Sequence, residues 1–235
     1  GSNHEVEPEV EPDHEVEVEV TVPTHEELAT RAERVRDRIA AAGGDPDAIT
    51  LLAVTKGFGP EVAVAAAGAG FVDLGENYAQ ELVAKAPVVA ASHPEVRWHA
   101  IGRLQRNKVR SLAGIVALWQ TVDRLDLGRE IAKRAPGAAV LVQVNVSDEP
   151  QKGGCAPEAT ADLVAGLVDH GLRVQGLMTV GRTGSPEQAR GGFALLRRLA
   201  DDLYLPVRSM GMSGDLEAAV AEGATLVRVG SALFG

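Results

Sequence analysis

Two glycine- and serine-rich bends near the end of the chain and one lysine near its beginning carry the clearest chemical signal. Residues 209–215 and 227–231 each have the pattern of a buried strand that breaks into Gly and Ser where a helix should begin. A helix start offers unpaired backbone N–H groups and a partial positive charge, and both suit a phosphate. Lys56 closes an early apolar strand, and a lysine amine can attack an aldehyde to form an imine. If Lys56 faces the two bends, we expect an aldehyde phosphate as the ligand.

Short apolar segments alternate with helical ones along most of the chain, and these elements must position the three groups. Strands are expected where apolar and β-branched residues concentrate, at residues 50–55, 71–74, 96–101, 115–121, 138–146, 173–180, 206–210 and 225–229. Helices are expected between them at residues 60–69, 78–91, 103–112, 124–135, 157–170, 186–203 and 215–222. One more helix precedes the first strand, beginning at a capping box formed by Thr24 and Glu27.

Apolar strands separated by helices predict an α/β fold with a parallel sheet that helices cover. Two architectures have this pattern, a closed (β/α)8 TIM barrel and an open doubly wound sheet. The open sheet usually carries its glycine fingerprint after the first strand, whereas this first strand ends in Lys56-Gly57-Phe58-Gly59, which lacks that spacing. The count of eight strands also equals that of the barrel. We therefore predict a single (β/α)8 barrel with an extra N-terminal helix.

Composition excludes several classes of partner. The formal charge of −10 is concentrated in residues 1–20, which hold eight acidic residues and no Lys or Arg. The rest of the chain is nearly neutral, so it has no general attraction for nucleic acid or anionic membranes. No apolar run reaches the length of a membrane helix. With no recognisable secretory signal and a single cysteine, Cys155, a cytoplasmic protein is expected.

The acidic N-terminal segment is a separate region in this interpretation. Residues 1–23 alternate Glu with Val or Pro, and the like charges on one face would repel each other in a strand. We predict a disordered acidic tail over residues 1–23, with a cloning remnant at residues 1–4, followed by one folded domain over residues 24–235.

In barrels of this kind the active site lies at the C-terminal ends of the strands. That rule selects Lys56, Glu76, Asn77, His99, Asn145, Met178, Thr179, Ser213, Arg228, Gly230 and Ser231. The loops after the seventh and eighth strands form the recurrent phosphate site of such barrels, which favours the bends at Ser213 and at Gly230–Ser231.

Each of these residues also has a structural interpretation. Lys56 is either a partly desolvated amine that can form an imine or a rim lysine that extends to water. Arg228 lies between two valines and points into the barrel, where it either pairs with a carboxylate such as Glu76 or faces the ring nitrogen of pyridoxal phosphate. Ser213 and Ser231 suit helix N-caps as well as a phosphate site.

The other reactive residue types carry weaker signals. His99 is expected to be a satisfied structural histidine, and Cys155 a free thiol without a special role. No group of His, Cys and carboxylate residues has metal-ligand spacing, so no metal site is predicted. The local basic patch is interpreted as a solvated helix face; it comprises Arg103, Arg106, Lys108 and Arg110.

Several segments together resemble the pyridoxal phosphate homeostasis protein family, whose fold is that of the alanine racemase N-terminal domain. The resemblance runs in order from Thr24 to Gly235. Its matching pieces are residues 53–56 (Ala-Val-Thr-Lys), 75–81 (Gly-Glu-Asn-Tyr-Ala-Gln-Glu), 98–108, 143–145, 176–179, 209–215 and 227–235.

The resemblance implies a monomeric barrel that binds pyridoxal 5'-phosphate as a Schiff base on Lys56. Ser213, Gly230 and Ser231 would surround the phosphate, Arg228 would lie near the ring nitrogen, and Asn77 and Met178 near the ring. It further implies a carrier or regulator of vitamin B6 with no established reaction and no catalytic residue, whose partners include pyridoxal phosphate-dependent apo-enzymes.

Two alternatives remain open. The first is an amino-acid racemase or a related pyridoxal phosphate enzyme, which would need a second acid/base group facing Lys56. Tyr78 follows the second strand and Tyr204 lies far from the strand ends, so neither tyrosine suits that role, although a carboxylate or His99 could replace it. The second is a barrel that binds a different phosphate, with Lys56 as a plain cation.

Overall fold

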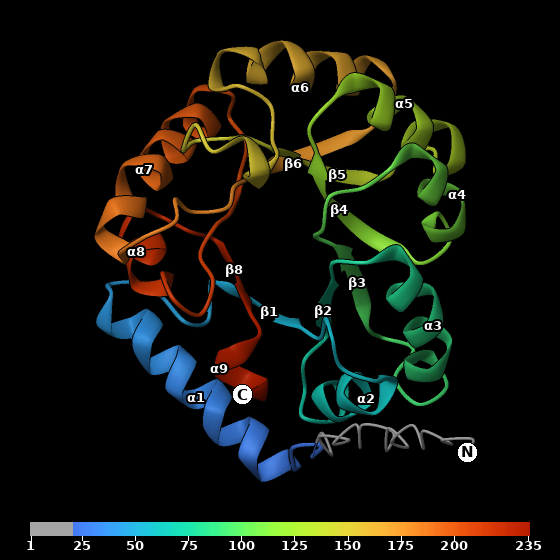
Figure 1. The fold of residues 1–235 in the computed structure, drawn as a ribbon, viewed down its shortest axis with the longest axis vertical. Helices are drawn as coiled ribbons and strands as arrows, with labels where there is room; N and C mark the ends of the chain where they lie inside the picture. Colours follow the sequence, from blue (N-terminus) through green and yellow to red (C-terminus); the bar gives the residue numbers. More distant parts are fainter. Residues whose placement is uncertain (1–20) are drawn as a thin grey trace, which may run out of the picture.

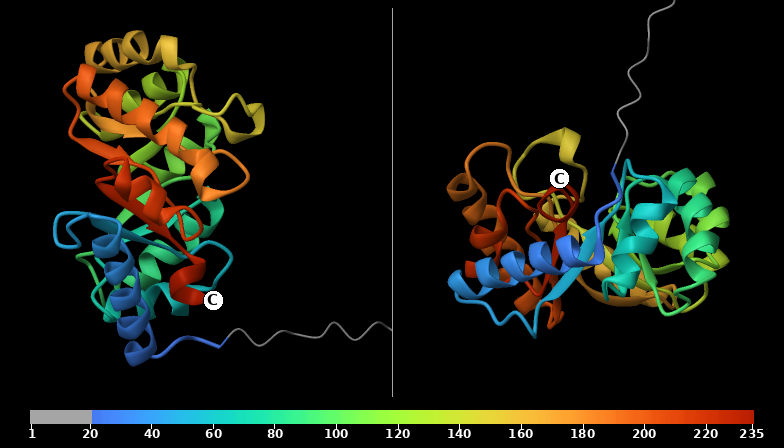
Figure 2. Two further views of the ribbon diagram at one scale, coloured as in Figure 1. Left: turned by 90° about the vertical axis from the view of Figure 1, so that its left-hand side faces the viewer. Right: turned by 90° about the horizontal axis from the view of Figure 1, so that it is seen from below.

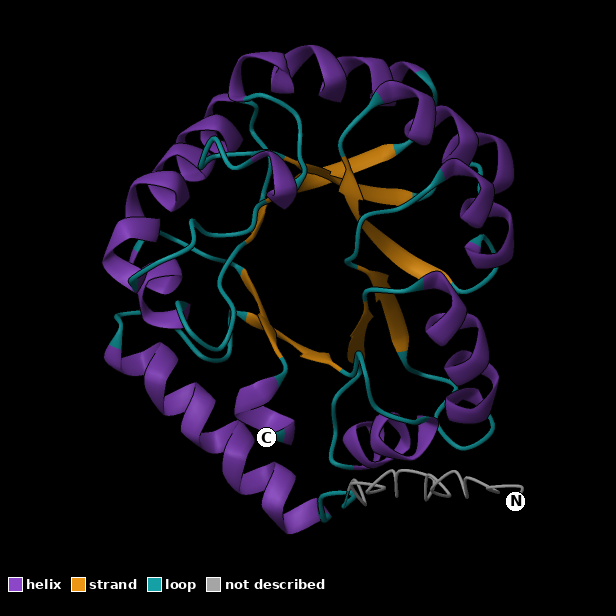
Figure 3. Ribbon diagram, viewed as in Figure 1, coloured by secondary structure: helices purple, strands orange, loops and turns teal. Residues whose placement is uncertain are grey.

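The computed structural model describes residues 21–235, and in this part of the chain eight parallel strands close into a barrel (Figures 1 and 3). The strands follow one another around the barrel in chain order, and β1 pairs with β8 to close it. Their bounds are β1 Thr50–Val54, β2 Asp73–Glu76, β3 Arg97–Ala100, β4 Val116–Val122, β5 Ala139–Gln143, β6 Arg173–Met178, β7 Val207–Ser209 and β8 Leu226–Val229. The predicted TIM barrel is confirmed. Of the predicted acidic tail, residues 1–20 lie outside the described residues.

Helices form an outer ring around the barrel (Figure 3). The α-helices are α1 His25–Ala41, α2 Pro60–Gly68, α3 Ala79–Ala90, α4 Val109–Leu112, α5 Leu125–Arg134, α6 Thr160–Asp169, α7 Pro186–Asp202, α8 Leu216–Ala221 and α9 Ser231–Phe234. Short 3₁₀ helices are η1 Arg106–Lys108, η2 Pro150–Lys152 and η3 Pro157–Ala159. The helix predicted over residues 103–112 is therefore wrong in its first half, and the turns η2 and α9 are not among the predicted helices.

The N-terminal helix α1 begins as its sequence predicts. The Thr24 hydroxyl accepts from the Glu27 N–H at 3.1 Å, and the Glu27 carboxylate accepts from the Thr24 N–H at 2.8 Å, which completes the capping box. The helix buries an apolar stripe at helical spacing, formed by Leu28, Ala32, Val35 and Ile39.

Helix α1 also fastens the C-terminal elements. The Arg31 guanidinium donates to the Leu233 carbonyl at 2.7 Å, and that of Arg38 donates to the Ser213 carbonyl at 2.7 Å. Arg38 also pairs with Glu217 in α8. In both views of Figure 2 the blue helix lies beside the red C-terminal segment. The first helix thus braces the two bends that follow β7 and β8.

The core has two parts. The larger one lies between the strands and the surrounding helices, with Trp119 and Phe193 as its largest fully buried side chains. The smaller one lies inside the barrel and consists of Leu118, Ala139, Leu141 and Met178. Buried polar side chains, among them Gln120, Ser209 and Arg228, share the barrel with it.

At the N-terminal end of the barrel, the Asp73 carboxylate is hydrogen-bonded by Arg97 and His99. The Arg97 guanidinium donates twice to Asp73, at 3.0 and 2.9 Å, and His99 Nε2 lies 3.0 Å from Asp73 Oδ1. Burial alone would raise the pKa of the Asp73 carboxyl, but the hydrogen bonds from His99 and Arg97 outweigh it and lower the pKa from 3.8 to about 2.

Asp73 is expected to make folding dependent on acid pH. Because its native pKa lies below the unfolded value, the stabilisation is fully present above pH 4 and is lost as the pH falls toward 2. The linked free energy is about 2 kcal/mol. Urea unfolding of the wild type and Asp73→Asn at pH 5 and pH 2 measures it: the stability difference between them should shrink by that amount at pH 2. An unchanged difference would contradict the prediction.

Candidate functional site

A cavity of 470 Å³ opens at the C-terminal end of the barrel, and it is lined by all seven residues that the sequence selects as ligand contacts. They come from the ends of β1, β2, β6, β7 and β8 and are Lys56, Asn77, Met178, Ser213, Arg228, Gly230 and Ser231. Val54, Ile101 and Val180 add apolar surface. The volume falls within the range of about 300–1,000 Å³ for small-molecule sites. The amine and the two bends therefore converge on one space.

Lys56 lies two residues beyond the end of β1, and its side chain is exposed. The exposed side chain agrees with the interpretation of Lys56 as a rim lysine that extends to water, because β1 ends at Val54, before Lys56. Its backbone is nevertheless fixed on both sides. The carbonyl of Thr55 accepts from Lys85 Nζ at 2.8 Å, and the N–H of Gly57 donates to Glu81 at 3.0 Å.

These contacts belong to a cluster of charged residues and one hydroxyl, here called the Lys85 cluster. It comprises Thr55, Glu76, Glu81 and Lys85. Lys85 Nζ lies 2.6 Å from Glu76 and 2.8 Å from Glu81, and its side chain is only 4% exposed. The Thr55 hydroxyl donates to the same Glu76 oxygen at 2.5 Å. The cluster therefore joins β2 and α3 to the loop that carries Lys56.

The two carboxylates of the cluster differ in their environment. Burial raises the pKa of Glu76 and exceeds the opposing effect of its hydrogen bonds from Lys85 and Thr55. Burial also acts to raise the pKa of Glu81, but the hydrogen bonds from Lys85 and Gly57 outweigh it and lower that pKa. The second oxygen of Glu76, Oε2, is buried with no partner among the described residues. Lys85 thus carries most of the electrostatic support for a fully buried carboxyl group.

Sequence reasoning missed Lys85, although the sequence holds a signal for it. Leu82, Lys85, Ala86 and Val89 form the buried stripe of α3 at helical spacing. A lysine on such a stripe needs a buried acceptor, because an unpaired charge there is costly.

Arg228 on β8 is 3% exposed and points into the barrel, as its position between two valines predicts. Its guanidinium donates to Ser209 Oγ at 2.7 Å and to the Thr179 carbonyl at 2.8 Å. The suggested ion pair with Glu76 is wrong, because Glu76 pairs with Lys85. Burial lowers the pKa of the Arg228 guanidinium to about 10, so it stays a cation at neutral pH.

The two bends supply backbone donors more than helix dipoles, since α8 has six residues and α9 has four. Among the described residues, the N–H groups of Gly214, Gly230 and Ser231 have no hydrogen-bond acceptor. Ser213 does not cap its own helix: its hydroxyl accepts from the Ala232 N–H at 3.2 Å and so caps α9. Ser231 is the first residue of α9, whose N-cap is Gly230.

Asp215 is the N-cap residue of α8, and its carboxylate accepts from the Met212 N–H at 2.7 Å. The bond from Met212 to Asp215 fixes the first bend, and the bond from Ala232 to Ser213 holds the two bends together. Gly214, Gly230 and Ser231, whose N–H groups are open, line the same cavity as Lys56, which suits an anion with several oxygens.

Asn77 and Met178 complete the lining from opposite sides. Asn77 follows β2, and its backbone is pressed against Gly102, where a Cβ would lie 1.9 Å from the Asn77 carbonyl. Only glycine fits there, so Gly102 fixes the course of the loop after β2. Met178 ends β6 and is 1% exposed, and it gives the cavity a polarisable apolar wall.

A second, larger cavity of 760 Å³ adjoins the first at Asn77. Arg103 and Lys108 of the basic patch line it, together with Arg124. The patch is solvated, as predicted, but the prediction that it forms one helix face is wrong, because Arg103 precedes the 3₁₀ helix η1, which begins at Arg106. Arg106 pairs with Asp126 at 3.7 Å.

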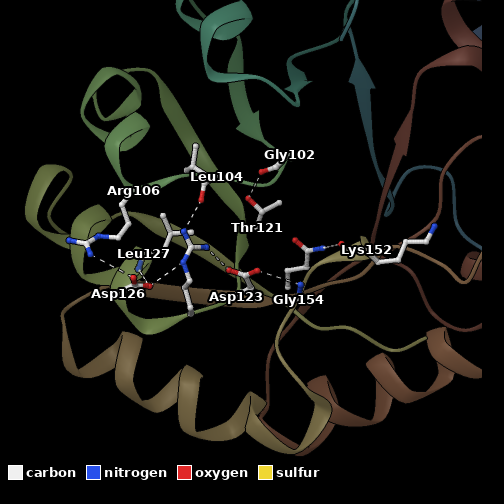
Figure 4. A network of polar contacts seen from close by, with 11 residues as sticks. Gly102, Leu104, Arg106, Thr121, Asp123, Asp126, Leu127, Lys152 and Gly154 are labelled. Atoms are coloured by element: carbon white, nitrogen blue, oxygen red, sulfur yellow. Dashed lines mark hydrogen bonds and ion pairs between the residues drawn. The ribbon is translucent and has the colours of Figure 1, made fainter. Parts of the chain in front are cut away.

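Figure 4 shows a network of polar contacts that includes Leu104, Asp123 and Arg124 of the lining of this second cavity. Thr121 donates to the Gly102 carbonyl at 2.8 Å, Arg124 pairs with Asp123 at 2.8 Å, and Gly154 N–H reaches Asp123 at 3.4 Å. These bonds tie together the loops after β3, β4 and β5.

The remaining reactive residue types lie outside the first cavity. His99 is buried within the barrel and hydrogen-bonded on both ring nitrogens, as expected of a structural histidine. Burial raises the pKa of the Cys155 thiol, which leaves it unactivated. In the described part of the chain, no group of three or more His, Cys, Asp or Glu residues is arranged to hold a metal ion. No helix between residues 21 and 235 could cross a bilayer.

Comparison with known proteins gives a consistent result. Residues 19–235 match the family described as alanine racemase, N-terminal domain. The chain is 43% identical to a pyridoxal phosphate homeostasis protein of Pseudomonas aeruginosa, covering 89% of this chain and 94% of the relative. It is 40% identical to the protein of the same name from Aquifex aeolicus, with 89% and 96% covered.

Solved structures agree. PipY of Synechococcus elongatus with PLP bound has a TM-score of 0.75 and 30% identity, covering 86% of this chain and 100% of PipY. A protein from Bifidobacterium adolescentis described as unknown has a TM-score of 0.83 and 35% identity, covering 89% and 95%. An alanine racemase of Clostridium difficile, at 15% identity and a TM-score of 0.65, covers 88% of this chain and 56% of the racemase, and shares the fold.

Proposed function

Because this chain belongs to the pyridoxal phosphate homeostasis protein family, we propose that it binds pyridoxal 5'-phosphate and takes part in the homeostasis of that cofactor. We further propose that Lys56 holds the cofactor as a Schiff base. The observation that carries the proposal is that one cavity is lined by Lys56, by Arg228 and by the residues of both bends whose N–H groups are open.

The residues of the cavity fit such a ligand in chemical type. When bound, the cofactor supplies an aldehyde that an amine can attack. The Lys56 amine, in its neutral form, bonds to that carbon while the aldehyde oxygen leaves as water. The N–H groups of Gly214, Gly230 and Ser231 would hold the phosphate. Met178 and Asn77 would contact the ring, and Arg228 would lie toward the ring nitrogen.

A carrier fits the cavity better than an enzyme. Racemisation needs an acid/base group on each face of the substrate carbon, and Lys56 supplies one. In the described chain, Lys56 and Arg228 are the only titratable side chains that line the cavity, and Arg228 is a buried cation. Tyr78 lines the adjoining cavity and is 63% exposed, and Tyr204 is 93% exposed. A racemase or related pyridoxal phosphate enzyme remains the alternative function.

We also propose that the protein acts as a monomer in the cytoplasm and passes the cofactor to pyridoxal phosphate-dependent apo-enzymes. The exposed side chain of Lys56 supports this role, since an acceptor can reach the bond that must be broken.

Mixing the purified protein with pyridoxal 5'-phosphate is expected to produce a visible absorption band. Borohydride should then fix the adduct, and peptide mapping should locate it on Lys56. A protein that stays colourless and leaves the cofactor unbound would contradict the proposal. Incubating the loaded protein with L-alanine and following optical purity tests the alternative: turnover at roughly 1 per second or faster would establish an enzyme.

A further inference from the structure

A chain of hydrogen bonds crosses the barrel interior from the cofactor cavity to the opposite end. Arg228 Nη1 lies 2.7 Å from Ser209 Oγ, and Ser209 Oγ lies 2.6 Å from Gln120 Oε1. Gln120 Nε2 lies 2.8 Å from His99 Nδ1, and His99 Nε2 lies 3.0 Å from Asp73 Oδ1. The five residues stand on β8, β7, β4, β3 and β2, and all five are buried.

The two ends of this chain fix the direction of every bond in it. A guanidinium can only donate and a carboxylate can only accept. Ser209 Oγ accepts a hydrogen bond from Arg228, so the Ser209 hydroxyl donates its own hydrogen to the Gln120 carbonyl oxygen. The Gln120 amide nitrogen then donates to His99 Nδ1. His99 must therefore be neutral, with its single proton on Nε2, which donates to Asp73.

The reverse orientation of Gln120 is disfavoured by the same contacts. Its nitrogen would then donate to Ser209, and the Ser209 proton would have no acceptor among the described residues in a fully buried position. A buried donor without a partner costs about 1–3 kcal/mol. The amide of Gln120 thus sets the tautomer of His99.

The chain also determines the charge next to the cavity. Arg228 is held by two neutral acceptors, Ser209 Oγ and the Thr179 carbonyl, and no described residue forms an ion pair with it. The Asp73 carboxylate is the negative group at the far end of the chain of hydrogen bonds, separated from Arg228 by His99, Gln120 and Ser209. Asp215, the N-cap residue of α8, favours the charged form of Arg228 but forms no ion pair with it. An uncompensated cation near the ring nitrogen of the cofactor opposes protonation of that nitrogen.

We propose that Gln120 and Ser209 are positioning residues that orient Arg228 toward the cofactor ring and keep its positive charge unneutralised. Gln120 achieves this because it is an amide: it accepts from Ser209 and donates to His99 at the same time. A carboxylate in its place would accept from both sides. The part of this inference that concerns the cofactor rests on the proposed function.

The tautomer of His99 gives the first test, and it needs no cofactor. In ¹⁵N-labelled wild-type protein at neutral pH, NMR should show a proton on His99 Nε2 and none on Nδ1. In Gln120→Glu, the new carboxylate has no proton to donate, so both ring nitrogens should carry one. A proton on Nδ1 in the wild type would overturn the proposal, even if the variant fails to fold.

The second test follows the visible absorption of the bound cofactor against pH. Gln120→Glu should move the midpoint of the absorption change upward by about 0.5 pH unit, because the new carboxylate lies nearer along the chain to the Ser209–Arg228 pair than the His99 imidazolium that balances its charge. Gln175→Glu is the matched control, since Gln175 lines the cavity at the N-terminal end of the barrel without a bond to this chain; its midpoint should stay at the wild-type value. Equal shifts in both variants would overturn the proposal. A protein with the expected His99 tautomer that binds no pyridoxal phosphate would contradict only the proposed function.

Discussion

Lys56→Ala is expected to abolish the visible band of the cofactor complex and the borohydride-fixed adduct. The alanine has no amine, and no other lysine lines the cavity in the described structure. Lys85 cannot replace it, because its ammonium is buried against Glu76 and Glu81. The phosphate contacts of the two bends would persist, so the variant should still bind the cofactor, but without the covalent bond.

Absorption and mass spectrometry after reduction measure the first effect, and equilibrium dialysis measures the remaining affinity. Lys133→Ala is the matched control, because Lys133 is an exposed lysine of α5 away from the cavity. It should form the adduct as the wild type does. A full-yield adduct in Lys56→Ala would show that another amine performs the chemistry.

Lys85→Met is expected to reduce the free energy of unfolding by about 3 kcal/mol at neutral pH, because removing one partner of a buried ion pair leaves the other charge uncompensated. Glu76, whose side chain is fully buried, would keep only the Thr55 hydroxyl as a donor. Thr55 would also lose the bond to its carbonyl, next to Lys56. Adduct formation should therefore slow as well.

The pH dependence separates this cause from a simple packing defect. Without the ammonium, the folded-state pKa of Glu76 rises further above its unfolded value. The variant should then be closer to the wild type at pH 5 than at pH 8, because protonation of Glu76, which removes the uncompensated charge, becomes more favourable as the pH falls. Urea unfolding at both pH values measures this difference. Lys133→Met should change stability by no more than about 0.5 kcal/mol. A loss in Lys85→Met that is equal at both pH values would contradict the ion-pair explanation.

The sequence was sufficient to predict the barrel and to find the cavity lining, for a physical reason. Parallel strands in a barrel bring their C-terminal ends to one rim. Residues that directly follow strands, such as Lys56 and Asn77, therefore lie at the same rim, even when the predicted strand ends are off by a residue. The alternation of side chains along a strand was also sufficient to predict that Arg228 points into the barrel.

The partners of those residues depend on contacts between distant segments, which local patterns do not encode. Ser209 and Gln120 are 89 positions apart, and their bond depends on the height of each side chain in the barrel. Ser213 caps α9 because the bends after β7 and β8 lie together, although its sequence position suggested α8. Strand β1 ends at Val54, one residue before the predicted end, so Lys56 lies beyond the strand and its side chain is exposed.

The pairing of β1 with β8 joins the first and last strands of the chain. During synthesis on a ribosome, Lys56 leaves the exit tunnel long before Gly230 and Ser231 are translated. A nascent chain therefore presents the lysine that we propose as the nucleophile before the proposed phosphate site exists, and it can hold the cofactor in the proposed way only after β8 and the bend that follows it have been made.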